Sequence, residues 1–289
     1  MSGSGSNAKK LIEKYISDRR TGNNSYFPAL IVTDNPFDSN ALNIAFKEYT
    51  KNDIPEFDRF YTSAFSLDIS AIRRTQGKKT IDDEVKAEWD SVVREELKTR
   101  DIQVIALDGY RFTTTLCEPA DEYDPVCLNV HPGALHVLYN GKPIYFGSGW
   151  EPSAKAMLNG ETTVRTSVHF VTSQLDGGAV AMQSRAVHIP LANSHHWTDR
   201  KQLSQGFPLV ADIRSYIKAH GEDEAKKQYP ILRTAMDLQK ALLTDGDHVV
   251  FPKTVDAVCR GHLTYDRKTN TAFNDGKPLP KYGIREADA

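Results

Sequence analysis

The stretch IQVIALDG, residues 102–109, is a short apolar run that ends at an aspartate and a glycine. Its length and its Asp-Gly ending predict a buried strand followed by a turn. The residues before it, 81–99, carry apolar side chains at helical spacing, and residues 26–33 (YFPALIVT) form an earlier apolar run of the strand type. Strand, helix and strand in this order predict right-handed parallel crossovers and an α/β sheet.

The rest of the chain extends this pattern. The other predicted elements are a helix at about 39–49, strands at 126–130, 162–172 and 179–189, helices at 213–220, 231–243 and 246–260, and a loop-rich tail after Thr264. No linker separates two cores, so residues 1–289 are expected to form a single domain. The polar stretch at about 191–245 is interpreted as a helical elaboration, because unstructured loops of that length are uncommon in compact domains.

Composition and charge limit the classes of function. The 289 residues include 36 Lys and Arg against 38 Asp and Glu, for a net charge of −2. This balance gives no electrostatic sign of binding to nucleic acid or to an anionic membrane. No apolar run approaches the roughly 18 residues of a membrane-spanning helix. We therefore expect a cytoplasmic protein whose partners are small molecules, present as a monomer or homodimer.

The three cysteines, Cys117, Cys127 and Cys259, are too few and too scattered for a disulfide framework or a zinc site. The apolar setting of Cys127 predicts an inert core thiol. Adjacent His195 and His196 are interpreted as surface residues, since no cysteine or carboxylate spacing accompanies them. No metal is expected.

The pentapeptide LNVHP, residues 128–132, carries the most informative pair of polar side chains. Residues two apart on a strand point to the same face, so Asn129 and His131 are expected to project together from a strand end. An amide and an imidazole in this position suit the binding of an oxyanion and the movement of a proton. Taken alone, the same pattern also fits an asparagine that bonds turn backbone and a packed histidine.

A carboxylate follows later in QLDGG, residues 174–178. Paired glycines permit a tight turn, and Asp176 delivered by that turn can pair with His131 and favour its imidazolium form. An ordinary Asp-Gly hairpin turn is the competing interpretation.

The N-terminal residues MSGSGSN run directly into a predicted helix at 7–20. A Gly/Ser loop at a helix start presents unpaired backbone N–H groups and the positive end of the helix dipole, which makes it an anion site. A cloning linker is the alternative for the first six residues.

Together these blocks resemble a known family. The segments SGSGSN (2–7), LNVHP (128–132), TSVHFVT with LDGG (166–178) and NDGKPLP (274–280) occur in the order found in the glycinamide ribonucleotide transformylases, or phosphoribosylglycinamide formyltransferases, of purine synthesis. The resemblance runs nearly end to end, apart from residues 191–245. It implies a Rossmann-like formyltransferase fold, with a mostly parallel twisted sheet and helices on both faces. It also implies formyl transfer from 10-formyltetrahydrofolate to the amine of glycinamide ribonucleotide.

The resemblance assigns roles residue by residue. The implied catalytic residues are Asn129, His131 and Asp176, with Asp176 keeping His131 protonated. The implied substrate-binding residues are Gly5, Ser6 and Asn7 for the phosphate and Asp247 for the ribose hydroxyls. The implied folate-binding residues are Lys86, the loop Arg111, Phe112, Thr113 and Thr114 within the strand-end segment 108–114, and again Asn129.

The sequence departs from the family in two places. The family has a parallel strand before its Gly-Ser-Asn loop, whereas this sequence begins at the loop, so we expect an upstream native start or another segment in that slot. The segment 135–150 is longer than its family counterpart, and Glu151 stands where the family has a histidine.

Two other functions remain open at this stage. The first is a different user of the same folate donor, such as a sugar-nucleotide N-formyltransferase or a formyltetrahydrofolate hydrolase. The second is an inactive folate- or nucleotide-binding module.

Overall fold

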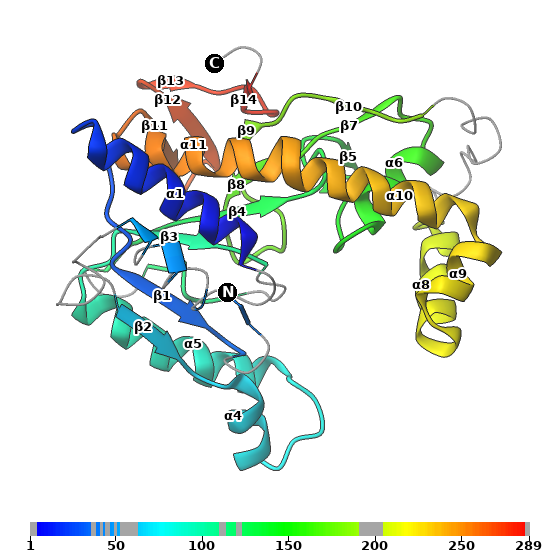
Figure 1. Cartoon of the computed structure of the whole chain (residues 1–289), viewed down its shortest axis with the longest axis horizontal. Coiled ribbons are helices and arrows are strands. Elements are labelled where there is room, and N and C mark those ends of the chain that lie inside the picture. The colour runs from blue at the N-terminus through cyan, green and yellow to red at the C-terminus, as the bar shows by residue number, and fades with distance from the viewer. Residues whose placement is uncertain are drawn as a thin grey trace.

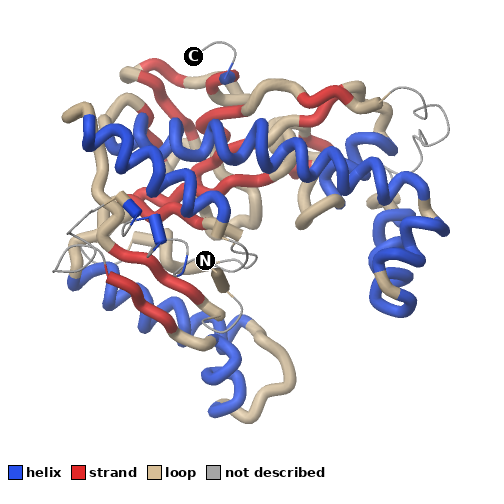
Figure 2. The backbone as a smooth tube through the Cα atoms, in the orientation of Figure 1, coloured by secondary structure: helices blue, strands red, loops and turns tan. Residues whose placement is uncertain are grey.

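The computed structural model combines helices and strands in a mixed α/β arrangement (Figures 1 and 2). It describes residues 5–35, 39–40, 43, 47–48, 51–52, 63–109, 114–119, 123–190 and 205–286. The helix predicted at about 39–49 lies mostly outside the described residues.

The central sheet has five strands in the order β14-β9-β8-β4-β3. These strands are β3 (Val104–Leu107), β4 (Val126–His131), β8 (Ser167–Phe170), β9 (Val180–Gln183) and β14 (Ile284–Arg285). The pairs β3/β4 and β9/β14 are parallel, whereas β4/β8 and β8/β9 are antiparallel. The prediction of a mostly parallel sheet is therefore wrong, and the sheet is mixed.

The short connection between β8 and β9 explains why these two strands are antiparallel. A parallel connection needs a crossover of a dozen or more residues, usually a helix. Residues 171–179 provide only a short connection containing the Asp176 turn, so the chain reverses direction. The apolar runs at 162–172 and 179–189 are each broken into two strands. The pieces outside the central sheet are β7 (Thr163–Val164), the first of its run, and β10 (Val187–His188), the second of its run, and they pair with one another.

Helices cover both faces of the sheet, as the resemblance implied. Helix α5 (Asp83–Thr99) buries Val85, Trp89, Val93 and Leu97 against Ile105 and Cys127. The opposite face of β4, with Leu128 and Val130, packs on α11 (His248–Cys259). The alternation of side chains along β3 and β4 thus divides the core into two layers.

The predicted helix at 81–99 is confirmed, and its start has a local cause. The Asp82 carboxylate accepts the backbone N–H of Val85, which satisfies one of the unpaired donors of the first turn. The short α4 (Ile69–Thr75), with the same kind of aspartate cap, packs beside it.

A separate parallel pair, β1 (Leu30–Thr33) with β2 (Ser63–Ser66), lies next to α5 (Figure 1). Among the described strands, β1 pairs only with β2, and β3 pairs only with β4 on its side of the central sheet. A cavity of about 830 Å³ lies between them, lined by β1, β3 and apolar side chains of α1, α5 and α11. Each of the two strands therefore presents one edge that no described strand pairs.

One long helical rod crosses the molecule beside α1 (Ser6–Arg20) (Figure 1). It consists of α10 (Pro230–Ala241), a π-helical turn η2 (Leu242–Asp247) and α11. The sequence predicted two helices at 231–243 and 246–260, but the π turn joins them without a break. Such turns often occur at functional positions in helices, and this one ends at Asp247.

The described part of the elaboration is helical, as predicted. Helices α8 (Pro208–His220) and α9 (Glu222–Gln228) pack against each other and, through α10 and α8, against α6 (Glu151–Leu158). The small ladder of β5 (Leu138–Tyr139) and β6 (Lys142–Pro143) precedes α6.

The C-terminal tail is more regular than predicted. Instead of a loop-rich segment, it forms an antiparallel sheet of β11 (Leu263–Asp266), β12 (Thr271–Asn274) and β13 (Lys277–Pro278), followed by β14. The ring of Tyr265 stacks on Phe170, with centroids 4.6 Å apart, which attaches this sheet to β8.

Candidate active site

Asn129 and His131 lie at the carboxyl end of β4, on strand positions two apart. His131 is only 4% exposed, whereas Asn129 is half-buried. The antiparallel neighbour β8 places His169 opposite Asn129 and Ser167 opposite His131. The predicted pair is therefore brought together, and it gains a second histidine.

Asp176 joins these side chains from the turn between β8 and β9. Its Oδ2 lies 3.6 Å from His131 Nδ1, and its Oδ1 lies 3.7 Å from His169 Nε2. Asp176 adopts a left-handed backbone conformation with φ 52°. A Cβ atom on Gly178 would lie only 1.7 Å from the carbonyl oxygen of Phe170, so only glycine permits this close approach.

Hydrogen bonds define the tautomer of His169. Its Nδ1 lies 3.0 Å from the carbonyl oxygen of Phe170 and donates to it. Its Nε2 therefore accepts, and the Asn129 Nδ2 lies 3.3 Å away to donate. Burial lowers the pKa of His169 to about 4, although the Asp176 carboxylate opposes the shift. His169 is thus neutral near pH 7 and holds the Asn129 amide in place.

His131 has an acceptor at each ring nitrogen. Its Nε2 lies 2.7 Å from the carbonyl oxygen of Tyr145, and its Nδ1 faces Asp176. An imidazolium can donate to both groups at once, whereas a neutral ring can donate to only one. Tyr145 belongs to the long segment 135–150, so this segment contacts the candidate site directly.

A second group of polar side chains lies at the start of α1. The Asn7 Nδ2 donates to Asp108 Oδ1 at 3.1 Å, and the Ala8 backbone N–H donates to Asp108 Oδ2 at 3.2 Å. Thr166, which directly precedes β8, donates to Asp247 Oδ1 at 2.6 Å. The predicted substrate residues Asn7 and Asp247 are thus both buried near the carboxyl ends of β3 and β4.

The two aspartates of this group have raised pKa values. Burial raises the pKa of Asp247 to about 7, with the nearby Asp108 acting in the same direction and the hydrogen bond from Thr166 opposing it. Burial also raises the pKa of Asp108, against the hydrogen bonds from Asn7 and Ala8. Removing these carboxylates from water disfavours their charged forms.

The predicted folate residues are only partly described. Arg111, Phe112 and Thr113 lie outside the described residues. Thr114 is buried and donates to Asp90 Oδ2 of α5 at 3.0 Å, and Lys86 pairs with Asp83 on the same helix at 2.8 Å. Among the described residues, no hydrogen bond joins Lys86 or Thr114 to the candidate catalytic side chains, which are Asn129, His131, His169 and Asp176.

Glu151, which the resemblance was expected to place where the family has a histidine, forms a bidentate ion pair. Arg214 of α8 donates to both of its carboxylate oxygens, at 2.8 and 2.7 Å. Because Glu151 is only 6% exposed, this pair fixes the helical elaboration to α6.

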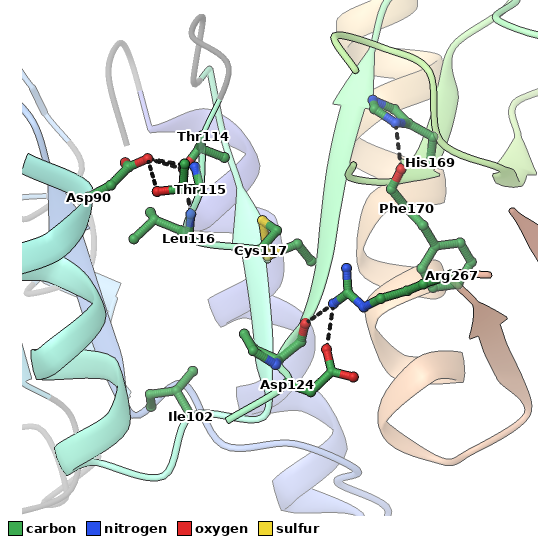
Figure 3. Close-up of a disulfide and its surroundings, with 12 residues drawn as sticks. Asp90, Ile102, Thr114, Thr115, Leu116, Cys117, Asp124, His169, Phe170 and Arg267 are labelled. Atoms are coloured by element: carbon green, nitrogen blue, oxygen red, sulfur yellow. Dashed lines mark hydrogen bonds and ion pairs between the residues drawn. A yellow bond between two sulfur atoms is a disulfide. The ribbon is translucent and has the colours of Figure 1, made fainter. Parts of the chain in front are cut away.

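Cys117 and Cys127 form a disulfide, with Cα atoms 5.5 Å apart (Figure 3). The prediction of an inert free thiol at Cys127 is therefore wrong for this structure. Linear spacing did not reveal the contact, which arises because the turn carrying Thr114 and Thr115 folds onto Asp90 of α5 next to the start of β4. The third cysteine, Cys259, has its pKa raised to about 11 by burial.

The described residues contain neither a membrane-spanning helix nor a metal-binding cluster. No described helix is both long enough and apolar enough to span a membrane. No group of three or more His, Cys, Asp or Glu side chains within the described ranges is placed to hold a metal ion. His195 and His196 lie outside those ranges.

No protein-family model matches the sequence. The phosphoribosylglycinamide formyltransferase of Haemophilus influenzae is 24% identical over 196 residues, which are 68% of this chain and 67% of that protein. The methionyl-tRNA formyltransferase of Thermotoga neapolitana is 24% identical over 164 residues, 56% of this chain but only 48% of that protein.

A solved structure gives the match in fold. The phosphoribosylglycinamide formyltransferase of Coxiella burnetii superposes with a TM-score of 0.54 at 17% identity, covering 99% of this chain and 95% of that one. The fold is thus the α/β fold seen in formyltransferases. The chain is distantly similar to phosphoribosylglycinamide formyltransferase in both sequence and structure.

Sequence reasoning missed three members of these groups. His169 and Thr166 were quoted only as part of a motif, and Asp108 only as part of a strand end. The alternation Ser167, His169 on a strand was the available signal for His169. Its contact with Asn129 depends on the antiparallel pairing of β4 and β8, which the prediction of a mostly parallel sheet did not include.

Proposed function

We propose that this protein transfers a formyl group from 10-formyltetrahydrofolate to the amine of glycinamide ribonucleotide. The observation that carries the proposal is the convergence of His131, Asp176 and Asn129 at one sheet end, backed by His169. An amide donor, an imidazole and a carboxylate in this arrangement suit acyl transfer through a tetrahedral oxyanion.

The proposed mechanism uses these side chains to stabilise charge. The acceptor amine attacks the formyl carbon, and negative charge develops on the formyl oxygen. The tetrahedral intermediate then collapses: the bond between the formyl carbon and the folate nitrogen breaks, the acceptor nitrogen gives up a proton, and tetrahydrofolate leaves with a proton on that nitrogen. The Asn129 amide and the protonated His131 donate hydrogen bonds to that oxygen, and Asp176 balances the positive charge of the imidazolium. Because both nitrogens of His131 already face acceptors, the formyl oxygen must replace the Tyr145 carbonyl or share the proton that faces Asp176.

The second group supplies the proposed acceptor site. Gly5, Ser6 and Asn7 at the start of α1 are proposed to hold the phosphate, and Asp247 to accept hydrogen bonds from the ribose hydroxyls. Thr166 supports this placement because it bonds Asp247 and directly precedes β8, whose Ser167 lies opposite His131.

The remaining assignments rest on the resemblance. Lys86 and the loop 111–114 are proposed to contact the folate. The chain is proposed to act as one domain, in the cytoplasm and in purine biosynthesis, as a monomer or homodimer. No metal, nucleic acid or membrane takes part in the proposed reaction.

An assay of formyl-folate consumption tests the proposal, with and without glycinamide ribonucleotide. Consumption that depends on this acceptor supports the proposal. Consumption without it indicates a hydrolase, and tight folate binding without turnover indicates a binding module. Consumption that depends on another amine, such as an amino sugar nucleotide, would keep formyl transfer and overturn the acceptor.

A further inference from the structure

The start of α1 is capped by an anion from within the protein. The N-cap Gly5 has no side chain, and the Asp108 carboxylate, at the end of β3, accepts the first-turn N–H of Ala8 at 3.2 Å. The same carboxylate accepts the Asn7 Nδ2 at 3.1 Å. Helix N-terminal N–H groups attract anions because they are unpaired and carry the positive end of the dipole. Asp108 thus uses donors that an incoming oxyanion would need.

The surroundings of Asp108 are rich in acceptors. The Asn7 Oδ1 is buried and has no hydrogen-bond partner, in a side chain that is only 5% exposed. Asp108 is close enough for its charge to act on Asp247, and both carboxyl groups are buried. An unpaired buried acceptor costs free energy, which a ligand that carries a hydroxyl group would recover. The site therefore suits a group that combines hydroxyls with an oxyanion.

We propose that Asp108 is an internal competitor for the oxyanion site at the start of α1 and thereby sets the affinity for a phosphorylated acceptor. An incoming phosphate must displace the Asp108 carboxylate from the Ala8 N–H, and it meets the negative charge of that carboxylate. Asp108 is thus a specificity-determining residue rather than a catalytic one. The part of this inference that concerns the acceptor rests on the proposed function, but competition for an oxyanion does not.

Sulfate is the probe for the experiment, because its charge does not change near neutral pH. Sulfate binding is measured by calorimetry on the full chain for the wild type and for Asp108→Asn, Asp108→Ser and Asp108→Glu. Both neutral variants remove a like charge close to the anion, and Asp108→Asn also keeps an oxygen that can accept the Ala8 N–H. We expect them to bind sulfate about tenfold more tightly than the wild type, and Asp108→Glu to show no gain.

A matched control is Asp256→Asn on α11, which removes an aspartate that contacts α1 through Lys14, away from the helix start. It should leave sulfate affinity unchanged. Unchanged or weaker sulfate binding in the neutral variants would overturn the proposal. Loss of the fold in both would also overturn it, because the carboxylate would then be an essential cap.

Failure here and failure of the proposed function are distinguishable. Sulfate binding is measured without folate or formyl transfer, so it reports on Asp108 whatever the acceptor is. Conversely, acceptor-dependent formyl transfer in a wild type whose neutral variants gain no sulfate affinity would keep the proposed function and remove the role of Asp108.

Discussion

The carboxylate of Asp176 lies 3.6 Å from Nδ1 of His131, although His131 ends β4 and Asp176 lies in the turn between β8 and β9. Both side chains are almost fully buried. A buried carboxylate is costly unless it is paired, so Asp176 depends on His131 for compensation, because Nε2 of the neutral His169 carries no proton to donate. The pairing holds the His131 ring in a fixed orientation at the end of β4.

The first prediction concerns this pair. His131→Ala and Asp176→Asn should each lower kcat by about 100-fold, which corresponds to roughly 3 kcal/mol of lost oxyanion stabilisation. Substrate KM should change much less, because the interactions lost are made mainly in the transition state. Steady-state kinetics of formyl transfer provide the measurement.

The chain offers a matched control for these variants. His262 and Asp275 form a second His–Asp pair, with Nδ1 and Oδ1 2.7 Å apart, on the exposed surface. Substituting Asp275→Asn there should leave kcat unchanged. Near-normal turnover in Asp176→Asn would remove that residue from the mechanism.

The second prediction concerns His169 as a positioning residue. Its pKa in the folded protein is lowered to about 4 by burial, below the ordinary value of 6.5. Between these two values the unfolded chain binds the proton and the folded protein does not. The contribution of neutral His169 to the free energy of unfolding is therefore complete above about pH 6.5. It is lost as the pH falls toward 4.

Substitution of His169 tests this assignment with two measurements. In His169→Gln, part of the acid-induced loss in free energy of unfolding between pH 6.5 and 4 should disappear, on the order of 2–3 kcal/mol. A second variant, His169→Leu, should in addition lower kcat, because leucine offers no acceptor to orient the Asn129 amide. An acid stability profile identical to that of the wild type would contradict the neutral buried state of His169.

Much of the fold follows from local sequence patterns. Helix α5 begins where Asp82 can cap it and buries the apolar face that the spacing predicted. Asn129 and His131 share a strand end because the side-chain period of a strand is two residues. These features depend on residues that are close in sequence, which is why the sequence alone was sufficient.

Long-range pairings could not be predicted in the same way. Asp108 reaches Asn7 across 101 positions, and Asn129 meets His169 only because β8 runs antiparallel to β4. The Cys117–Cys127 contact depends on how a turn packs against β4. Each of these contacts is decided by tertiary packing rather than by local propensity or periodicity.

The third prediction concerns Asp247, whose pKa is raised by burial to about 7 in the folded protein. Between the ordinary value of 3.8 and about 7, the folded state binds a proton that the unfolded state has lost. The contribution of protonated Asp247 to the free energy of unfolding is therefore complete below about pH 4. It is lost as the pH rises through 7.

Asp247→Asn mimics the protonated side chain and should remove this dependence. The variant should be more stable than the wild type at pH 8 and similar to it near pH 4, as measured by urea unfolding at both values. The hydrogen bond from Thr166 can be retained by the amide oxygen. If the variant and the wild type differ in free energy of unfolding by the same amount at both pH values, the pKa of Asp247 is not raised.

The fourth prediction concerns the Cys117–Cys127 disulfide, which closes a loop with a sequence separation of 10. A cross-link of this length stabilises a protein by about 3 kcal/mol in the chain-entropy model, because it restricts the unfolded chain. Adding a reductant should lower the free energy of unfolding of the wild type by roughly that amount. The double variant Cys117→Ser with Cys127→Ser should already be at the lower value and should not respond to the reductant.

Cys259→Ser provides the control. Cys259 is not part of the disulfide, so this substitution should leave the response to reductant intact. A reducing cytoplasm would keep both thiols free, so the measurement is made on protein oxidised in vitro, with the bond confirmed by a mass difference of about two hydrogens. If reductant leaves the stability of that oxidised wild type unchanged, the bond does not contribute to the fold. The packing of the 114–119 turn against α5, through Asp90 and its hydrogen bonds to Thr114 and Thr115, would then be sufficient to hold this end of β4.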